Sequence, residues 1–318
     1  MKITEHIEKA QGQTLFSLEI IPPTKGSGIE DLYKHIDPLI EFKPPFIDVT
    51  TSREEYVYLE RAGGLMERRM TRMRPGTLGI CSAIQHKYGV DTVPHLLCGG
   101  FTKEETEYLL VDCLYLGIHN VMALRGDARK GEVHFQPSEG GHSLARELVE
   151  QINDIGRGKY LTDRDRCKDE NYFCVGVAGY PEKHIEAPSM KKDLQRLKEK
   201  VEAGADYVVT QMFFDNRTYF DFVKEARALG ITVPIIPGIK PIAIKGHLSM
   251  LPKTFKIDLP EALIKEVEKA SGTKAVQEIG IEWAIAQCKE LKEAGVPILH
   301  FYSMGKSDNI QKIASALF

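Results

Sequence analysis

The sequence has few of the features that mark membrane, secreted or nucleic-acid-binding proteins. Its 318 residues include only one tryptophan, and no apolar run approaches the roughly 18 residues of a membrane span. The formal net charge is −3, from 42 basic and 45 acidic residues, so neither nucleic acid nor an anionic membrane is indicated as a partner. The first six residues are polar and helix-like rather than a secretory signal. We therefore expect a cytoplasmic protein.

The cysteines give no signature of a metal site. There are six, and none belongs to the Cys-x-x-Cys pattern of zinc and iron–sulfur sites. Several lie in apolar runs, where a reduced thiol behaves as a small hydrophobic side chain. The sequence also lacks Gly-x-Gly-x-x-Gly after its first expected strand, which disfavours an open nucleotide-binding sheet.

What the sequence does contain is an alternation of short apolar segments with helical ones. Continuous apolar strands are typical of parallel strands buried on both faces, and eight strand–helix alternations predict a (β/α)₈ TIM barrel. Such a barrel needs about 250 residues, so we expect residues 1–318 to form a single catalytic domain with insertions and no separate regulatory domain. The expected strands cover 15–21, 46–50, 92–98, 121–124, 172–179, 207–211, 233–238 and 298–302.

Apolar residues at helical spacing, together with capping residues, predict the helices between these strands. Thr102 and Glu105, for example, form a capping box. Residues 53–76 are expected to leave the barrel surface, 128–141 to form a loop, and 156–171 to be a charged insertion without an assigned role. The expected helices are one at the N-terminus and those at 29–42, 77–88, 102–116, 143–155, 189–203, 216–229, 244–251, 260–270, 274–294 and 310–318.

Polar residues stand at the carboxyl ends of the expected strands, where barrel enzymes place their active sites. Glu19 lies between two apolar neighbours; burial would raise the pKa of its carboxyl group, which suits a general acid. Glu19 could instead form a structural salt bridge, His95 could be a core histidine, and Arg125-Gly126-Asp127 could be a surface turn. The full set is Glu19, Thr50, His95, Arg125, Asp127, Tyr180, His184, Gln211 and Lys306. These residues indicate an enzyme with a large flat organic cofactor, but they do not name its reaction.

An ordered set of motifs resembles the methylenetetrahydrofolate reductase family, in its short bacterial form. Each motif is weak alone, but together they cover residues 13–306 and are specific. They are Phe-Ser-Leu-Glu-Ile-Ile-Pro-Pro at 16–23, Pro-His-Leu-Leu-Cys at 94–98, Leu-Arg-Gly-Asp at 124–127, Ala-Gly-Tyr-Pro-Glu-Lys-His at 178–184, Thr-Gln-Met-Phe-Phe-Asp at 210–215, Ile-Pro-Gly-Ile at 236–239 and His-Phe-Tyr at 300–302.

The resemblance implies a reaction and a cofactor. The family uses FAD, bound non-covalently, to reduce 5,10-methylenetetrahydrofolate to 5-methyltetrahydrofolate with NADH or NADPH by a ping-pong mechanism, which supplies methyl groups for methionine biosynthesis. We also expect a homo-oligomer, no metal, and no regulation by S-adenosylmethionine. The choice between NADH and NADPH stays open.

The resemblance also assigns residues. Glu19 matches the general acid and Asp127 the carboxylate near the flavin and the pterin. Arg125 is expected to face the phosphates or polar edge of FAD, and His184 its phosphate or ribose region. The positions that match FAD contacts are Thr50, His95, Leu124, Arg125, Gly126, Asp127, Ala145, Tyr180, His184, Ala187, Asp193 and Lys200. Those that match substrate contacts are Glu19, Asp127, Gln211, His247 and Lys306.

Some positions depart from the family pattern. Lys306 replaces an arginine for the folate tail and loses its bidentate fork. His247 replaces an amide, and Leu251 replaces a phenylalanine that packs on nicotinamide in some members. The alternatives are therefore the same reaction with electrons from a partner redox protein, or a barrel that binds folate or flavin without turnover. Retention of Glu19 and Asp127 argues against the latter.

Overall fold

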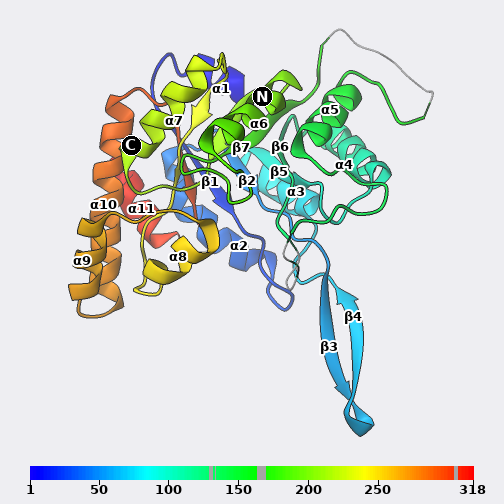
Figure 1. Ribbon diagram of the computed structural model, residues 1–318, viewed down its shortest axis with the longest axis horizontal. Helices are drawn as coiled ribbons and strands as arrows, with labels where there is room; N and C mark the ends of the chain where they lie inside the picture. Colours follow the sequence, from blue (N-terminus) through cyan, green and yellow to red (C-terminus); the bar gives the residue numbers. More distant parts are fainter. Residues whose placement is uncertain (129–131, 133, 163–169, 304–306) are drawn as a thin grey trace.

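A ring of parallel strands forms the centre of the molecule (Figure 1). The structure is a computed structural model that describes residues 1–128, 132, 134–162, 170–303 and 307–318. Within them the strand order is β10-β11-β1-β2-β5-β6-β7-β8-β9, all paired in parallel. The strands are β1 (Leu15–Ile20), β2 (Phe46–Val49), β5 (Asp91–Leu97), β6 (Asn120–Leu124), β7 (Cys174–Gly179), β8 (Tyr207–Thr210), β9 (Ile235–Ile236), β10 (Gly238–Ile239) and β11 (Ile298–Tyr302).

The barrel closes at Pro237. The sequence predicts one strand over 233–238, but the structure splits it into β9, which pairs with β8, and β10, which pairs with β11. Proline has no N–H to donate, while its carbonyl accepts a hydrogen bond from His300 N at 3.1 Å. The two ends of the ladder are therefore neighbours in sequence, and the predicted (β/α)₈ barrel is confirmed with this correction.

Helices follow the strands and pack outside them (Figure 1). The helix predicted at 29–42 becomes α2 followed by the 3₁₀ helix η1, because Pro38 stands at the junction and cannot continue an α-helix. The remaining helices differ from their predicted bounds by a few residues. They are α1 (Ile3–Lys9), α2 (Ile29–Ile36), η1 (Asp37–Phe42), α3 (Thr77–Tyr88), α4 (Lys103–Tyr115), α5 (Ala145–Gly156), α6 (Met190–Glu202), α7 (Asn216–Ala228), α8 (His247–Phe255), α9 (Glu261–Lys269), α10 (Thr273–Glu293) and α11 (Asp308–Ser315).

Helix α1 closes the amino-terminal end of the barrel. The N-terminal ammonium group lies 2.9 Å from Asp91, at the start of β5, and Ile3 N donates to Asn120 Oδ1 at 2.9 Å, at the start of β6. Ile3 is fully buried in a cluster with side chains from inside the barrel, among them Phe46 and Tyr207. The carboxyl ends of the strands are thus left as the face for a site.

Residues 53–76 leave the barrel as predicted, and most of them form a β-hairpin. Strand β3 (Glu55–Arg61) pairs antiparallel with β4 (Leu65–Thr71) through the short turn η2 (Ala62–Gly64). The hairpin emerges between β2 and α3, at the carboxyl end of a barrel strand, and extends away from the body of the molecule (Figure 1).

Buried thiols contribute to the packing between barrel and helices. The five cysteines in the described residues are all free and buried, which confirms the prediction of reduced thiols in apolar surroundings. Burial raises the pKa of the Cys98 thiol to about 12, so this group stays protonated and unreactive. Across the described residues, no helix combines the length and apolar character required to cross a membrane.

Gly176 provides a test of the packing inside the barrel. A Cβ atom there would lie 2.4 Å from Cζ of Tyr207, its fully buried neighbour on β8. We expect Gly176→Ala to destabilise the fold by about 1–3 kcal/mol, because overpacked barrel side chains must shift. The measurement is chemical denaturation. Gly79→Ala, in open space on α3, is the matched control and should be neutral or slightly stabilising. Equal stability of the Gly176 variant and the wild type would contradict the account.

Candidate active site

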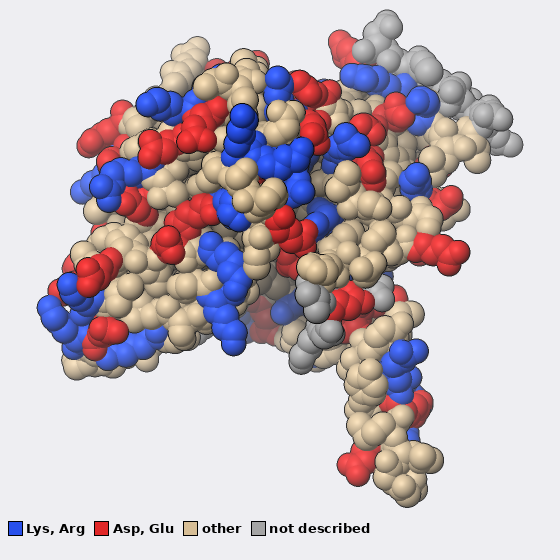
Figure 2. All heavy atoms as spheres, in the orientation of Figure 1, with Lys and Arg blue, Asp and Glu red and all other residues tan. Residues whose placement is uncertain are grey.

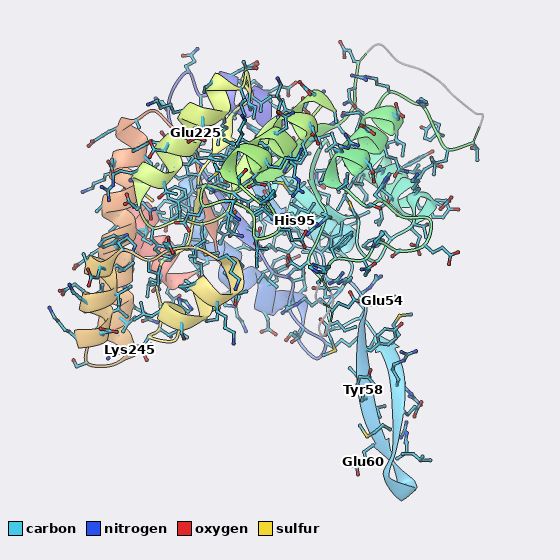
Figure 3. The ribbon with its side chains drawn as sticks, in the orientation of Figure 1. Glu54, Tyr58, Glu60, His95, Glu225 and Lys245 are labelled. Atoms are coloured by element: carbon cyan, nitrogen blue, oxygen red, sulfur yellow. The ribbon has the colours of Figure 1, made fainter. Side chains whose placement is uncertain are left out.

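Three ionisable side chains from adjacent strands meet inside the carboxyl half of the barrel. Glu19 on β1 and Asp48 on β2 are register partners, and His95 projects from β5 (Figure 3). His95 Nε2 lies 3.3 Å from Asp48 Oδ2 and 3.6 Å from Glu19 Oε2. Asp48 and His95 are buried, whereas the Glu19 side chain keeps 16% of its surface exposed. Glu19 is therefore the most exposed member of this cluster.

Burial and charge set the proton affinities in this cluster. Burial raises the pKa of Glu19, nearby His95 lowers it and Asp48 raises it again, leaving the pKa at about 7. Burial pushes the pKa of His95 down, but the hydrogen bond to Asp48 and the charge of Glu19 outweigh it and raise this pKa above its usual value. Near neutral pH, Glu19 can thus hold a proton, and the hydrogen bond to Asp48 favours the charged form of His95. Glu19 thus has the raised pKa that a general acid needs, and it also lies close to His95, as the salt-bridge interpretation expects.

Strand β11 forms the wall of the site beside this cluster. Ser17 Oγ and His300 Nδ1 are 2.8 Å apart, and burial lowers the pKa of His300, which keeps this imidazole neutral. The Tyr302 hydroxyl donates to the carbonyl of Thr210 at 2.6 Å. Gly238 must lack a side chain here, because its Cβ would lie 2.5 Å from the Tyr302 ring. These contacts fix the wall beside Glu19.

A cavity opens next to Tyr302. It measures about 270 Å³, and the buried Lys240 and His247 line it together with Tyr302 and Ser303. Lys240 Nζ donates to the Tyr302 carbonyl at 3.2 Å. Burial, followed by the charge of Lys240, lowers the pKa of His247. A larger open hollow of about 430 Å³ between α6 and α7 contains none of the predicted site residues, so we place the site at the barrel mouth.

A second cluster stands at the ends of β6 and β7. The Arg125 guanidinium pairs with Glu186, and the rings of Tyr180 and His184 meet edge to face at 4.7 Å. The backbone N–H of His184 donates to the buried Asp193 at 2.8 Å. Burial, together with Arg125, lowers the pKa of His184.

Lys200 completes the second cluster from helix α6. Its ammonium group donates to the Ala178 carbonyl, at the end of β7. Burial lowers the pKa of Lys200 to about 8, although Asp193 raises it. The two clusters stand at neighbouring strand ends, since β5, which carries His95, pairs with β6, which ends at Leu124 just before Arg125.

The backbone after β6 has the form that its glycine predicts. Gly126 adopts a φ of +85°, a conformation that side chains other than glycine rarely take, and a Cβ there would meet only Leu97, at 4.0 Å. Asp127 is exposed, and its carbonyl accepts from Arg53 at 2.7 Å. The end of β6 thus has free space beside the backbone of Gly126 and an exposed carboxylate at Asp127.

The other predicted residues lie around the same face. Thr50 and Leu124 are half-buried at strand ends, Ala145 begins α5, and Ala187 is buried beside the second cluster. Gln211 follows β8, and its Oε1 accepts from Met212 N at 3.0 Å. Lys306 lies outside the described residues.

The sequence reasoning missed Asp48, Lys240 and Tyr302 as site residues. Asp48 carries the same signal that singled out Glu19, a carboxylate within an apolar strand. Lys240 directly follows the Ile-Pro-Gly-Ile motif, where a buried cation could also have been suspected. Tyr302 gave no signal beyond its place at the end of β11.

Comparison with known proteins adds the family. Residues 2–317 match the family model described as Methylenetetrahydrofolate reductase. The chain is 36% identical to "Methylenetetrahydrofolate reductase (NADH) 1" of Arabidopsis thaliana, over 99% of this chain and 50% of the relative. It is 29% identical to "5,10-methylenetetrahydrofolate reductase" of Pectobacterium carotovorum, over 96% of this chain and 91% of the relative. The chain spans about half the length of the plant relatives it matches.

A solved structure supports the fold. It belongs to an uncharacterized protein from Clostridium thermocellum described as binding two copies of 5-methyl-5,6,7,8-tetrahydrofolic acid. The two share 14% sequence identity with a TM-score of 0.60, over 99% of this chain and 97% of the other. From the family match and the sequence identity, the chain belongs to the methylenetetrahydrofolate reductase family.

Proposed function

We propose that this chain reduces 5,10-methylenetetrahydrofolate to 5-methyltetrahydrofolate, with NADH or NADPH as the source of electrons. The observation that carries the proposal is Glu19, a largely buried carboxyl group whose pKa of about 7 keeps it partly protonated at the mouth of the barrel. The methylene bridge must open before its carbon can accept hydride, so a proton must reach the leaving nitrogen. Glu19 is the group that holds such a proton, as a general acid does.

His95 and Asp48 act on Glu19 rather than on the substrate. When Glu19 gives up its proton, a negative charge forms in a buried site, which is costly without a partner. His95, whose pKa Asp48 helps to raise, lies 3.6 Å from the Glu19 carboxyl group. It therefore stabilises the carboxylate that remains after proton transfer, and Asp48 orients the imidazole through the contact at 3.3 Å.

We propose FAD as the cofactor, bound across the second cluster. It would carry hydride between the nicotinamide nucleotide and the folate. Arg125 fits a phosphate group because its guanidinium presents five donors, of which Glu186 uses only part. The open backbone at Gly126 fits the close approach of a flat ring. We assign the remaining contacts to Thr50, His95, Leu124, Asp127, Ala145, Tyr180, His184, Ala187, Asp193 and Lys200.

Substrate binding is proposed for residues around the cavity and the neighbouring strand ends. Among the described residues the amide nitrogen of Gln211 donates no hydrogen bond, so it can donate to a pterin edge, while its oxygen is held by Met212. The exposed Asp127 carboxylate can accept from the same heterocycle. His247 lines the cavity, and its Nδ1 accepts from Ala243 N at 3.2 Å. Lys306 is kept as a candidate for the folate tail carboxylates.

The partner-protein alternative gains no support from Leu251. This side chain is fully buried in a cluster with Met212 and Phe214, so the replacement of phenylalanine by leucine alters internal packing rather than an open surface. The single catalytic domain over 1–318, the absence of regulation by S-adenosylmethionine, the homo-oligomer and the cytoplasmic location stay predictions.

The visible spectrum of the purified protein tests cofactor, donor and acceptor together. We expect a flavin band that bleaches on anaerobic addition of NADH or NADPH and returns when methylenetetrahydrofolate is added. A flavin band that ignores both nucleotides would favour a partner protein as the electron donor. No flavin band, even after incubation with FAD, would contradict the cofactor assignment.

The pH dependence of folate reduction tests Glu19. Because the acid must be protonated, the wild-type kcat/KM for methylenetetrahydrofolate should fall as pH rises through about 7. Glu19→Gln should lower this kcat/KM by roughly 100-fold or more, in line with the usual contribution of a general acid, and should remove this pH dependence.

A matched control is Glu104→Gln, at an exposed position on α4, which should behave as the wild type. Unchanged methyltetrahydrofolate formation in Glu19→Gln would remove Glu19 from the role of acid. Oxidation of the nucleotide by the Glu19 variant should persist, because that half-reaction needs no proton at the folate nitrogen.

A further inference from the structure

The hairpin of residues 55–71, here called the arm, is tied to the rest of the described chain at its base, where Lys25 Nζ donates to Thr71 Oγ1 at 2.6 Å, and neither of its strands pairs with a barrel strand. Its two strands form a sheet of their own, so each leaves one edge of backbone donors and acceptors unpaired. Each strand spans about 24 Å, at roughly 3.4 Å per residue. Figure 1 shows the arm standing clear of the barrel. A two-stranded hairpin alone is marginally stable in water, and free edges are templates for further pairing.

The arm exposes large apolar side chains that a solitary hairpin does not need. Tyr56 and Tyr58 alternate along β3 and lie on the same face as Met66 and Met70, which follow from the β3–β4 register. Exposed fractions reach 62% for Tyr58 and 60% for Met70. In Figure 2 the arm is largely tan, with both blue and red side chains among the tan ones. Such a surface of mixed charge and apolar groups suits a protein partner.

Strand β3 is complementary to itself when read in the opposite direction. It begins with the acidic Glu55 and ends with the basic Arg61, with Tyr58 at its centre. If β3 pairs antiparallel with β3 of a second copy about a two-fold axis at Tyr58, Glu55 faces Arg61 at both ends and Val57 faces Leu59. Opposite charges facing each other across strands stabilise a sheet. The same operation on β4 would place Arg68 against Arg68, which is unfavourable.

The ion pairs within the arm leave Arg61 able to bind a second carboxylate. Glu67 accepts from both Arg61 and Arg69, so one carboxylate serves two guanidinium groups. Among the described residues Glu55 forms no ion pair, although it lies on the same face. Glu55 of a second copy would supply the missing negative charge beside Arg61, whose guanidinium has donors to spare.

We propose that the arm is a dimerisation element, in which β3 pairs antiparallel with β3 of a second copy of this chain. The product is a four-stranded sheet with order β4-β3-β3-β4, and the two Tyr58 rings lie side by side on its apolar face. Three or more strands with a hydrophobic face are what a hairpin lacks for stability, and an isologous contact of this kind closes as a dimer. This inference is independent of the reductase activity.

Cysteine cross-linking tests the register directly. In Tyr58→Cys the two introduced thiols would face each other at about 5 Å between Cα atoms, within the range of a disulfide. Mild oxidation should therefore yield a covalent dimer on a non-reducing gel. Glu60→Cys is the matched control on the same face of β3 (Figure 3), because its two copies would be four residues out of register, roughly 13 Å apart. Wild type treated with the same oxidant corrects for native cysteines.

Charge reversal tests the proposed pairing without a cross-link. Sedimentation equilibrium of the full chain should show a dimer. Glu55→Arg places two arginines opposite each other at both ends of the contact and should raise the dimer Kd by about tenfold or more. Glu55→Arg combined with Arg61→Glu should recover most of the affinity, whereas Glu60→Arg, which would face Tyr56, should leave the Kd unchanged.

A chain that is monomeric at tens of micromolar would overturn the proposal. It would do so even if the arm were found to bind a different protein, because the proposed partner is a second copy of this chain. A dimer that neither cross-links through Tyr58→Cys nor responds to Glu55→Arg forms through another surface and would overturn it as well.

Discussion

One imidazole between two carboxyl groups is the interaction on which the proposed site depends. Asp48 and Glu19 are held inside an otherwise apolar barrel, where two unpaired charges would be very costly. His95 offsets this cost by contacting both groups, and both of them raise its pKa. Among the described residues Asp48 Oδ1 has no hydrogen-bond partner, so this carboxylate relies heavily on His95. The arrangement leaves Glu19, the more exposed of the pair, as the one that can exchange a proton.

The strand tips could be read from the sequence because their chemistry contradicts their surroundings. Glu19 stands out within an apolar strand, and Gly126 stands out because the apolar run stops abruptly at Arg-Gly-Asp; in the structure this glycine has a positive φ. Asp48 carried the same signal and was overlooked. The pairing of these groups could not be predicted, since it depends on which strands become neighbours when the barrel closes. The break at Pro237 was also missed, because the apolar run 233–238 reads as continuous although proline cannot donate to the ladder.

The hairpin shows a different limit of sequence reasoning. Two seven-residue strands flank Ala62-Gly63-Gly64, and paired glycines between such segments are a hairpin signal that the abundance of charge concealed. Its position ties it to the site, because it leaves from the end of β2 and Arg53, beside its base, donates to the Asp127 carbonyl. In the proposed dimer the tip of each arm lies beside the base of the other arm. The tip would therefore lie near Arg53, which contacts the backbone of Asp127.

The most direct test of the account is the protonation state of Glu19 itself. Infrared difference spectra between the wild type and Glu19→Gln, recorded as a function of pH, isolate the stretching band of this one carboxyl group. The account predicts a protonated carboxyl band at neutral pH that disappears with a midpoint of about 7. A midpoint near the ordinary glutamate value of about 4.3 would contradict it, because Glu19 would then hold no proton to donate at neutral pH.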